Sequence, residues 1–171
     1  PSQKRSLDQI LKAGWYLLDL INEILDLALI ESGRLSLSPE PVSLADVMHE
    51  CQTMVEPQAR QRRIHVSFPQ MAVPHIVKGD RTRVKQILIN LLSNAIKYNR
   101  TGGSVVVDCV ASGPGRIRIC VTDTGEGLAA EKLAQLFQPF NRLGQEAHVE
   151  EGTGIGLVVC KRLIELMGGV I

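Results

Sequence analysis

Apolar side chains recur every three or four positions along the first part of the chain. This spacing predicts one long amphipathic helix over residues 3–34. The positions that form its apolar seam are Leu7, Ile10, Leu11, Gly14, Leu18, Ile21, Leu25 and Ala28. A helix of about 30 residues is roughly 45 Å long, more than a small domain covers, so we expect the seam to meet another helix or a second copy of the chain. Gly33 predicts the end of the helix, and the run SLSPEPVS after it, with two prolines, predicts a linker.

Helical and alternating patterns succeed one another beyond this linker. Ser43 is a suitable N-cap, with Asp46 three residues later, and predicts a helix that ends near Arg60. Alternating apolar positions over residues 64–68 predict a strand, and residues 75–78 predict a short extended segment.

The second half of the chain contains two further helices and a hairpin. A strong helical pattern covers residues 81–98. The segments SVVVDCVA and RIRICVTD flank the turn SGPG, which predicts two antiparallel strands. A short helix is predicted over residues 131–137, no clear pattern covers residues 141–151, and a last helix is predicted to begin near Ile155.

Composition limits the class of protein. Hydrophobic residues make up 44% and charged residues 22% of the 171 residues, which predicts one folded core. The net charge of +1 gives no electrostatic reason to expect a nucleic-acid partner, and no apolar run approaches the roughly 20 residues that cross a bilayer. The four cysteines are widely spaced and form no CxxC pair, so we expect buried, reduced thiols. The chain starts at Pro1 without an initiator methionine, so we expect it to be part of a longer protein.

The helix QILINLLSNAIKYN carries the first candidate site. At 100° per residue, Gln86, Asn90, Asn94 and Lys97 fall in one narrow stripe, opposite an arc formed by Val84, Leu88, Leu91, Leu92 and Ala95. Asparagine has a poor helix propensity, so two asparagines in one stripe suggest a functional role. An amide oxygen can ligate Mg²⁺, and a lysine one turn away can meet a phosphate. A solvated polar face explains the stripe equally well.

Two glycine-rich turns are the other candidate sites. In DTGEGL, Asp123 leaves a strand and could accept a hydrogen bond from an amino group such as that of adenine, although an ordinary acidic turn has the same pattern. In GTGIGL, backbone N–H groups could converge on an anion at a helix N-terminus, or the glycines could form a flexible hinge. The spacing matches neither the dinucleotide fingerprint nor the P-loop.

Taken in order, four motifs resemble the N, G1, F and G2 boxes of sensor histidine kinases: NLLSNA, DTGEG, FQPF and GTGIGL. This resemblance implies an α+β fold, a two-layer sandwich of the Bergerat type. Its mixed, mostly antiparallel sheet would carry helices on one face, with a long helix before it. Two domains are implied: residues 1–38, the second helix of a dimerisation and histidine-phosphotransfer hairpin, and residues 39–171, the catalytic and ATP-binding domain.

The resemblance also implies a role for each site residue. Asn94 would ligate the Mg²⁺ that bridges the ATP phosphates, while Asn90 and Lys97 would be catalytic, supporting that site and approaching the phosphates. Tyr98 would pack against adenine, and Asp123 would bind the adenine amino group. The remaining nucleotide-binding positions would be Gly125 and Gly127 in the pocket wall, Phe137 and Phe140 at one end of a mobile lid over residues 141–151, and Gly152, Thr153, Gly154, Ile155, Gly156 and Leu157 at its other end.

Some parts of the family pattern are not found in this sequence. The first helix of the hairpin is missing, and the strands that the family places after Gly169 are not included, so the sheet should be short of strands. None of His49, His65, His75 and His148 has the context H-[ED]-x-[RK]-[TN]-P of a phosphoacceptor. We therefore expect surface or packing roles for them, with His148 in the lid able to approach a nucleotide.

The position of Asn90 separates kinases from related ATP-hydrolysing proteins. Type II topoisomerases, Hsp90-like chaperones and mismatch-repair proteins place a glutamate four residues before the metal-binding asparagine, where it activates water; an amide cannot accept that proton. The resemblance thus implies an ATP-dependent protein-histidine kinase of a two-component system, acting on a histidine of a helix outside this chain.

The same resemblance implies partners and a location. They are ATP, Mg²⁺, the phosphoacceptor helix, a response-regulator receiver domain and, in the full-length parent, a second copy. We expect a cytoplasmic domain with no nucleic-acid partner and no membrane insertion of its own, and we do not expect this stretch alone to phosphorylate itself. The rival interpretation is a nucleotide-binding regulatory or dimerisation scaffold without kinase turnover.

Overall fold

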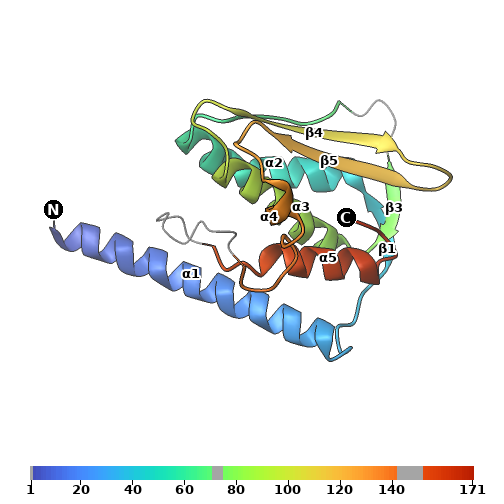
Figure 1. Cartoon of the computed structure of the whole chain (residues 1–171), viewed down its shortest axis with the longest axis horizontal. Coiled ribbons are helices and arrows are strands. Elements are labelled where there is room, and N and C mark those ends of the chain that lie inside the picture. Colours follow the sequence, from blue (N-terminus) through green and yellow to red (C-terminus); the bar gives the residue numbers. More distant parts are fainter. Residues whose placement is uncertain (1, 71–74, 142–151) are drawn as a thin grey trace.

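A long helix lies beside a body made of strands and shorter helices (Figure 1). The structure, a computed structural model, describes residues 2–70, 75–141 and 152–171. The elements in chain order are α1 (Ser2–Glu31), β1 (Glu40–Ser43), α2 (Leu44–Gln61), β2 (His65–Ser67), β3 (Ile76–Gly79), α3 (Arg81–Lys97), β4 (Ser104–Ala111), β5 (Ile117–Asp123), α4 (Ala130–Leu133) and α5 (Gly156–Leu166).

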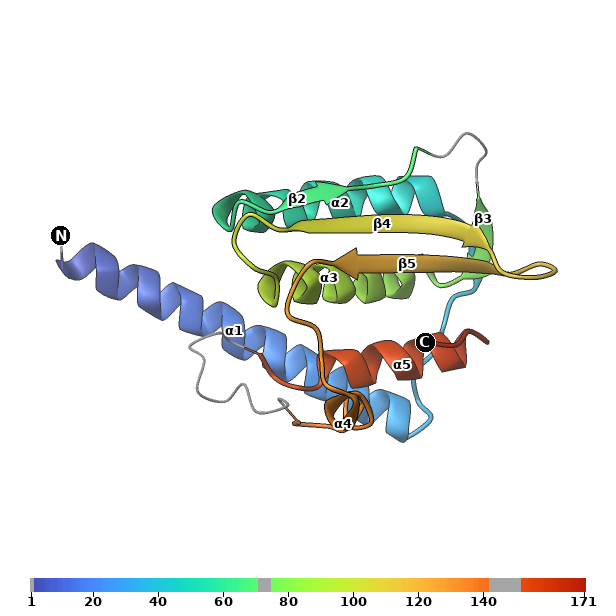
Figure 2. The ribbon, with the colours of Figure 1, turned by 45° about the horizontal axis from the view of Figure 1, so that its top comes forward.

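The strands form two small sheets. The larger has the order β2-β4-β5, with β2 parallel to β4 and β4 antiparallel to β5, so that Val107 lies opposite Val121. In the smaller, β1 and β3 pair antiparallel. Helices α2 and α3 cover one face of the larger sheet (Figure 2). The prediction of an α+β fold with a mixed, mostly antiparallel sheet and helices on one face is therefore confirmed.

The main core fills the space between the larger sheet and the helices α2 and α3. Along β4, Val105 and Val107 are buried, while Val106 between them is exposed, because successive side chains of a strand point to opposite faces. The helices supply the other side of this core, through Val47, Cys51, Val55, Leu88, Leu92, Ala95 and Ile96. Burying each large side chain contributes roughly 1.5–3 kcal/mol, so this layer holds the body together.

A second core lies on the other side of α3, against α5 and the end of α1. Ile155, Val159 and Leu163 are buried there with Ile87 and Leu27. Leu91 packs against this second cluster. The predicted arc of Leu88, Leu91 and Leu92 is therefore divided between two cores, because α3 is covered on two sides.

Element boundaries differ from the predicted ones where pairing partners are distant. The run SLSPEPVS was predicted to be a linker, but its last four residues form β1, in which Pro41 lies opposite Lys78. A proline is tolerated here because β1 lies at the edge of a two-stranded sheet.

Ser43 caps α2 as predicted, accepting a hydrogen bond from the Asp46 N–H at 3.4 Å. Of the lid predicted over residues 141–151, the positions 142–151, His148 among them, lie outside the described residues.

Much of the apolar seam of α1 is uncovered. Leu7, Leu11, Leu18 and Leu25 are between 46% and 61% exposed, whereas Leu27 near the end of the helix is buried. Within the described residues, no helix is long and apolar enough to span a membrane. All four cysteines are free, and Cys51 and Cys160 are buried.

Candidate functional site

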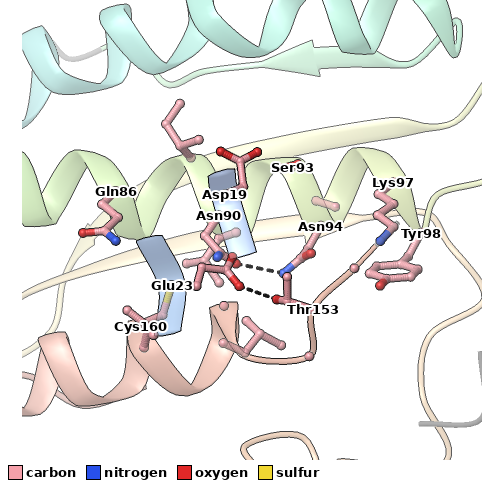
Figure 3. Close-up of a pocket in the computed structure, with 18 of the residues that line it drawn as sticks. Asp19, Glu23, Gln86, Asn90, Ser93, Asn94, Lys97, Tyr98, Thr153 and Cys160 are labelled. Atoms are coloured by element: carbon pink, nitrogen blue, oxygen red, sulfur yellow. Dashed lines mark hydrogen bonds between the residues drawn. The ribbon is translucent and has the colours of Figure 1, made fainter. Parts of the chain in front are cut away.

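A cavity of about 920 Å³ lies between α3, the end of β5, the start of α5 and the middle of α1. Most of its lining residues come from these four segments, which are far apart in the sequence. Figure 3 shows the polar residues that reach it, with α3 behind them and the glycine-rich loop before α5 below.

The polar stripe of α3 forms one wall of this cavity. Asn90, Asn94, Lys97 and Tyr98 all line it. The amide nitrogen of Asn94 donates to the side-chain oxygen of Asn90 at 3.0 Å, which orients both amides. The side-chain oxygen of Asn94 accepts no hydrogen bond from the described residues, so it is available to a ligand. Lys97 places its Nζ 4.8 Å from the centre of the Tyr98 ring.

The glycine-rich loop forms the opposite wall and packs directly on α3. A Cβ on Gly156 would collide with the Asn90 amide, and one on Gly152 would come within 2.6 Å of Lys97 Nζ. Gly154 has φ +71° and lies against the Phe140 backbone. Gly154 and Gly156 are therefore needed for this close approach. Helix α5, 11 residues long, starts here, so its positive end faces the cavity.

The G1 turn forms the third wall, at the end of β5. Asp123 accepts a hydrogen bond on Oδ1 from the Gly125 N–H at 2.8 Å. A Cβ on Gly125 would lie 2.5 Å from the Tyr98 carbonyl oxygen, so only glycine fits there. Gly127 has φ +70°, a conformation that other residues rarely adopt. This geometry holds the Asp123 carboxylate beside Tyr98 at the cavity.

A hydroxyl network behind this turn was not predicted. Thr124 Oγ1 accepts from the Ser104 N–H at 2.9 Å and donates to Asn99 Oδ1 at 3.0 Å, and Asn99 Nδ2 donates to the Ser104 carbonyl at 2.9 Å. It links the ends of α3 and β5 to the start of β4. In sequence, these three residues look like ordinary turn residues, so no local signal identified them.

Helix α1 forms the fourth wall, which was also not predicted. Tyr16, Asp19, Glu23 and Asp26 line the cavity. Glu23 accepts a hydrogen bond from the Thr153 hydroxyl, and burial raises the pKa of this carboxyl although that hydrogen bond opposes the shift. The spacing of 19, 23 and 26 places these acidic residues on one helical face, a signal that the sequence contained.

Asp26 binds the opposite end of the α3 stripe. Its Oδ1 lies 2.9 Å from Arg83 Nη1, and its Oδ2 accepts from Gln86 Nε2 at 2.7 Å. Both charged side chains are largely buried, at 16% exposure for Asp26 and 20% for Arg83. Gln86, predicted to belong to the polar stripe, is therefore engaged with α1.

The predicted site residues divide into two groups in the structure. Those that line the cavity are Asn90, Asn94, Lys97, Tyr98, Asp123, Gly127, Gly152, Thr153, Gly154, Gly156 and Leu157. The others lie around it: Gly125 behind Asp123, Ile155 in the second core, Phe137 with its ring 4.9 Å from Lys161 Nζ, and Phe140, which is 65% exposed. The Phe140 N–H donates to the Gly154 carbonyl at 3.1 Å, which joins the F-box segment to the loop.

A metal ion at this site would need ligands other than a cluster of acidic side chains. Among the described residues, no group of three or more His, Cys, Asp and Glu side chains could hold one. A neutral amide oxygen at Asn94 suits Mg²⁺ when phosphate and water oxygens complete the coordination. Asn94 fits this role because its oxygen has no protein partner among the described residues.

The chain is similar to known proteins over almost its whole length. The model of the histidine kinase-, DNA gyrase B- and HSP90-like ATPase family matches residues 79–171. An uncharacterized sensor-like histidine kinase of Rhizobium meliloti (strain 1021) is 38% identical over 168 residues, which cover 98% of this chain and 32% of that protein. This chain spans about a third or less of the length of the curated relatives it matches.

Two solved structures have a similar fold. Full-length ShkA in complex with AMPPNP aligns with a TM-score of 0.81 and 29% identity, covering 98% of this chain and 35% of that one. The histidine kinase ThkA in complex with the response regulator protein TrrA aligns with a TM-score of 0.72 and 25% identity, covering 97% of this chain and 45% of that one.

Proposed function

Because the chain belongs to the family of histidine kinase-, DNA gyrase B- and HSP90-like ATPases, we propose that it binds Mg-ATP in this cavity and transfers the γ-phosphate to a histidine outside this chain. The observation that carries the proposal is the convergence of Asn94, Asp123 and the loop 152–156 around one cavity. These segments are homologous to parts of sensor histidine kinases, and the ShkA structure holds an ATP analogue.

The adenine would lie at the Asp123 end of the cavity. With Oδ1 held by the Gly125 N–H, the Asp123 carboxylate can accept a hydrogen bond from the adenine amino group. Tyr98 lies next to it, so its ring can pack against the base.

The phosphates would lie at the other end, between Lys97 and the start of α5. Lys97 supplies a positive charge, and the loop 152–156 supplies backbone N–H groups at a helix N-terminus. Mg²⁺, held by the Asn94 amide oxygen, would neutralise phosphate charge. Asn90 orients Asn94 through the 3.0 Å hydrogen bond.

The residues of the site favour transfer to a histidine over hydrolysis. Asn90 occupies the position where a general base would activate water, and an amide cannot accept a proton. The site would therefore work by positioning the phosphates and neutralising their charge. His49, His65 and His75 do not line the cavity, which supports an acceptor histidine that comes from another helix.

Further partners are proposed on two grounds. The exposed seam of α1 supports association with another helix or a second copy. The complex of ThkA with TrrA supports a response regulator as the next phosphate acceptor.

The binding step is tested by calorimetric titration with Mg-ATP. We expect Asp123→Asn to weaken ATP binding by about tenfold or more, because a hydrogen bond to a charged group contributes about 1.5–3 kcal/mol. Asp108→Asn, the same change on the exposed face of β4, serves as the control and should leave the affinity unchanged. Equal affinities for Asp123→Asn and the wild type would contradict the proposed site.

The transfer step needs a separate experiment. The chain is mixed with a phosphotransfer helix from a homologous kinase and with γ-labelled ATP. Acid-labile label on a histidine supports the kinase. Tight ATP binding without label on any histidine helix would favour the nucleotide-binding scaffold instead.

A further inference from the structure

Helix α1 brings negative charge to the end of the cavity where the phosphates would lie. Asp19 and Glu23 line the cavity beside Asn90 and Asn94 (Figure 3). The positive charge of Lys97 acts on Glu23 against the repulsion from Asp19 and Asp26. Asp26 is already paired with Arg83. Two carboxylates therefore share the positive charge that a nucleotide would need.

Glu23 also accepts a hydrogen bond from a donor of the glycine-rich loop, the Thr153 hydroxyl. Its carboxylate accepts the hydroxyl hydrogen of Thr153, and Thr153 Oγ1 in turn accepts from the Ile155 N–H at 3.2 Å. The contact thus connects α1 to the start of α5. A hydroxyl has one hydrogen, so Thr153 cannot donate to Glu23 and to a phosphate oxygen at the same time.

The rest of the contact surface fixes α1 in this place. Asp26 is bound by Arg83 and Gln86 of α3, and Leu27 is buried in the second core with Leu163 of α5. These contacts come from residues next to Glu23 in the sequence, and the second core also includes Ile155 at the end of the glycine-rich loop. They hold the helix, and Glu23 is the residue that reaches the loop.

We propose that the seating of α1 through Glu23 and the binding of the ATP phosphates at the glycine-rich loop compete with each other. The inference rests on the proposed nucleotide site and adds a regulatory contact to it. The phosphates would bring negative charge against Glu23 and Asp19 in a partly buried cavity, where charge repulsion is weakly screened. By linkage, ATP weakens the seating of α1 by the same factor by which seated α1 weakens ATP binding.

The competition would couple the nucleotide state to the position of α1. In the structure, α1 forms one wall of the cavity. With ATP bound, Glu23 would lose its hydrogen bond to Thr153. Helix α1, which carries the exposed apolar seam, would then be held less firmly. The acidic face of α1 and the loop 152–156 thereby form a contact that opens when substrate binds.

The test compares Glu23→Gln with Glu31→Gln, the same change at the exposed end of the same helix. Calorimetric titration of the whole chain measures the Kd of Mg-ATP and of adenosine. We expect Glu23→Gln to bind ATP about five- to tenfold more tightly, as expected from removing one charge and weakening one hydrogen bond. Its affinity for adenosine, which carries no phosphate, should be unchanged. Glu31→Gln should behave as the wild type.

Each other outcome has a defined meaning. Weaker ATP binding by Glu23→Gln would overturn the inference and make Glu23 a ligand of the metal–phosphate complex. Equal ATP affinity, or an equal gain for adenosine, would overturn it while leaving the nucleotide site intact. Failure of the wild type and of Glu23→Gln to bind ATP would overturn the proposed function and this inference together.

Asp26→Asn, which removes the ion pair with Arg83, provides a second variant if Glu23→Gln does not fold. It should also tighten ATP binding.

Discussion

Thr124 illustrates how much a single side chain contributes to the site without touching the cavity. Its hydroxyl joins the Ser104 N–H to the Asn99 side chain, at 2.9 and 3.0 Å, and so fixes the turn that carries Asp123. The neighbouring Asp123 lines the cavity, whereas Thr124 does not. Thr124 is thus a positioning residue.

Thr124→Val should remove this network with little change in shape. The Ser104 N–H then loses its partner, and we expect a loss of about 1–3 kcal/mol in the free energy of unfolding, measured by denaturant titration. Because the Asp123 turn loosens, the affinity for ATP should fall severalfold. Thr124→Ser keeps the hydroxyl and should restore both values. Thr122→Val, on the exposed side of β5, is the matched control and should change neither.

At the scale of elements, α3 serves three purposes at once. One side packs against the sheet through Leu88 and Leu92, another against α5 through Ile87 and Leu91, and the stripe between them lines the cavity. A helix held on two sides keeps its third side rigid, which suits a binding site.

The start of α3 is fixed by Asp80. Its Oδ1 accepts from the Arg83 N–H at 3.1 Å and its Oδ2 from the Ser38 N–H at 3.0 Å. Partial burial acts to raise the pKa of Asp80, but the backbone hydrogen bonds and the charge of Arg83 together outweigh it, so the pKa lies below the ordinary value of 3.8. The ionised carboxylate therefore stabilises the folded state.

The stability of the chain should depend on the ionisation of Asp80. Since the pKa is lower in the folded state, the contribution is fully present above about pH 5 and is lost as the pH falls below 3.8 through the folded-state value. The free energy of unfolding of the wild type should exceed that of Asp80→Asn by less than about 1 kcal/mol, because solvent screens the group. The difference should shrink in acid. A difference that is constant from neutral to acidic pH would contradict this role.

At the scale of the whole molecule, α1 differs from the body beside it. The end of the helix packs on α5 and α3, while most of its apolar seam is exposed to solvent. Large side chains such as Trp15, at 65% exposure, rarely remain uncovered over such a length. The seam thus favours a helix partner, which a second copy can supply.

We predict that the chain associates with itself in a concentration-dependent way. Sedimentation equilibrium should show a shift toward the dimer as the concentration rises, and Leu18→Glu should weaken it by placing a charge in the seam. Leu166→Glu, an equally drastic change at an exposed position of α5, is the control and should have no effect. A monomer at every concentration would contradict the prediction.

Sequence patterns predicted the elements that depend on neighbours along the chain. The helices over α2 and α3 and the β4–β5 hairpin follow from periodicity, from the caps and from the turn SGPG. The same patterns did not predict β1, because its partner β3 lies beyond α2 in the chain and a proline obscures the strand. They also did not show that Leu91 would pack against α5 while Leu88 and Leu92 pack against the sheet, because a helical projection does not say which layers cover a helix.

For the site, each motif alone left its use open, and the four motifs in order resembled the boxes of sensor histidine kinases. Asn90, Asn94, Lys97, Asp123 and the glycines of the loop 152–156 are recognisable because each motif is local, and its spacing survives in any fold. Whether these motifs meet is a matter of distances between segments, which a spacing along the chain does not contain. The structure brings them around one cavity.

By itself, then, the sequence determined the local elements and the motifs, including an asparagine at position 90. Only the tertiary structure decided that α1 forms a wall of the same cavity and that Glu23 meets Thr153, a residue 130 positions away. The physical reason is that propensity and periodicity act between near neighbours. Contacts between distant residues depend on how the layers pack, and these contacts place acidic residues where the phosphates would bind.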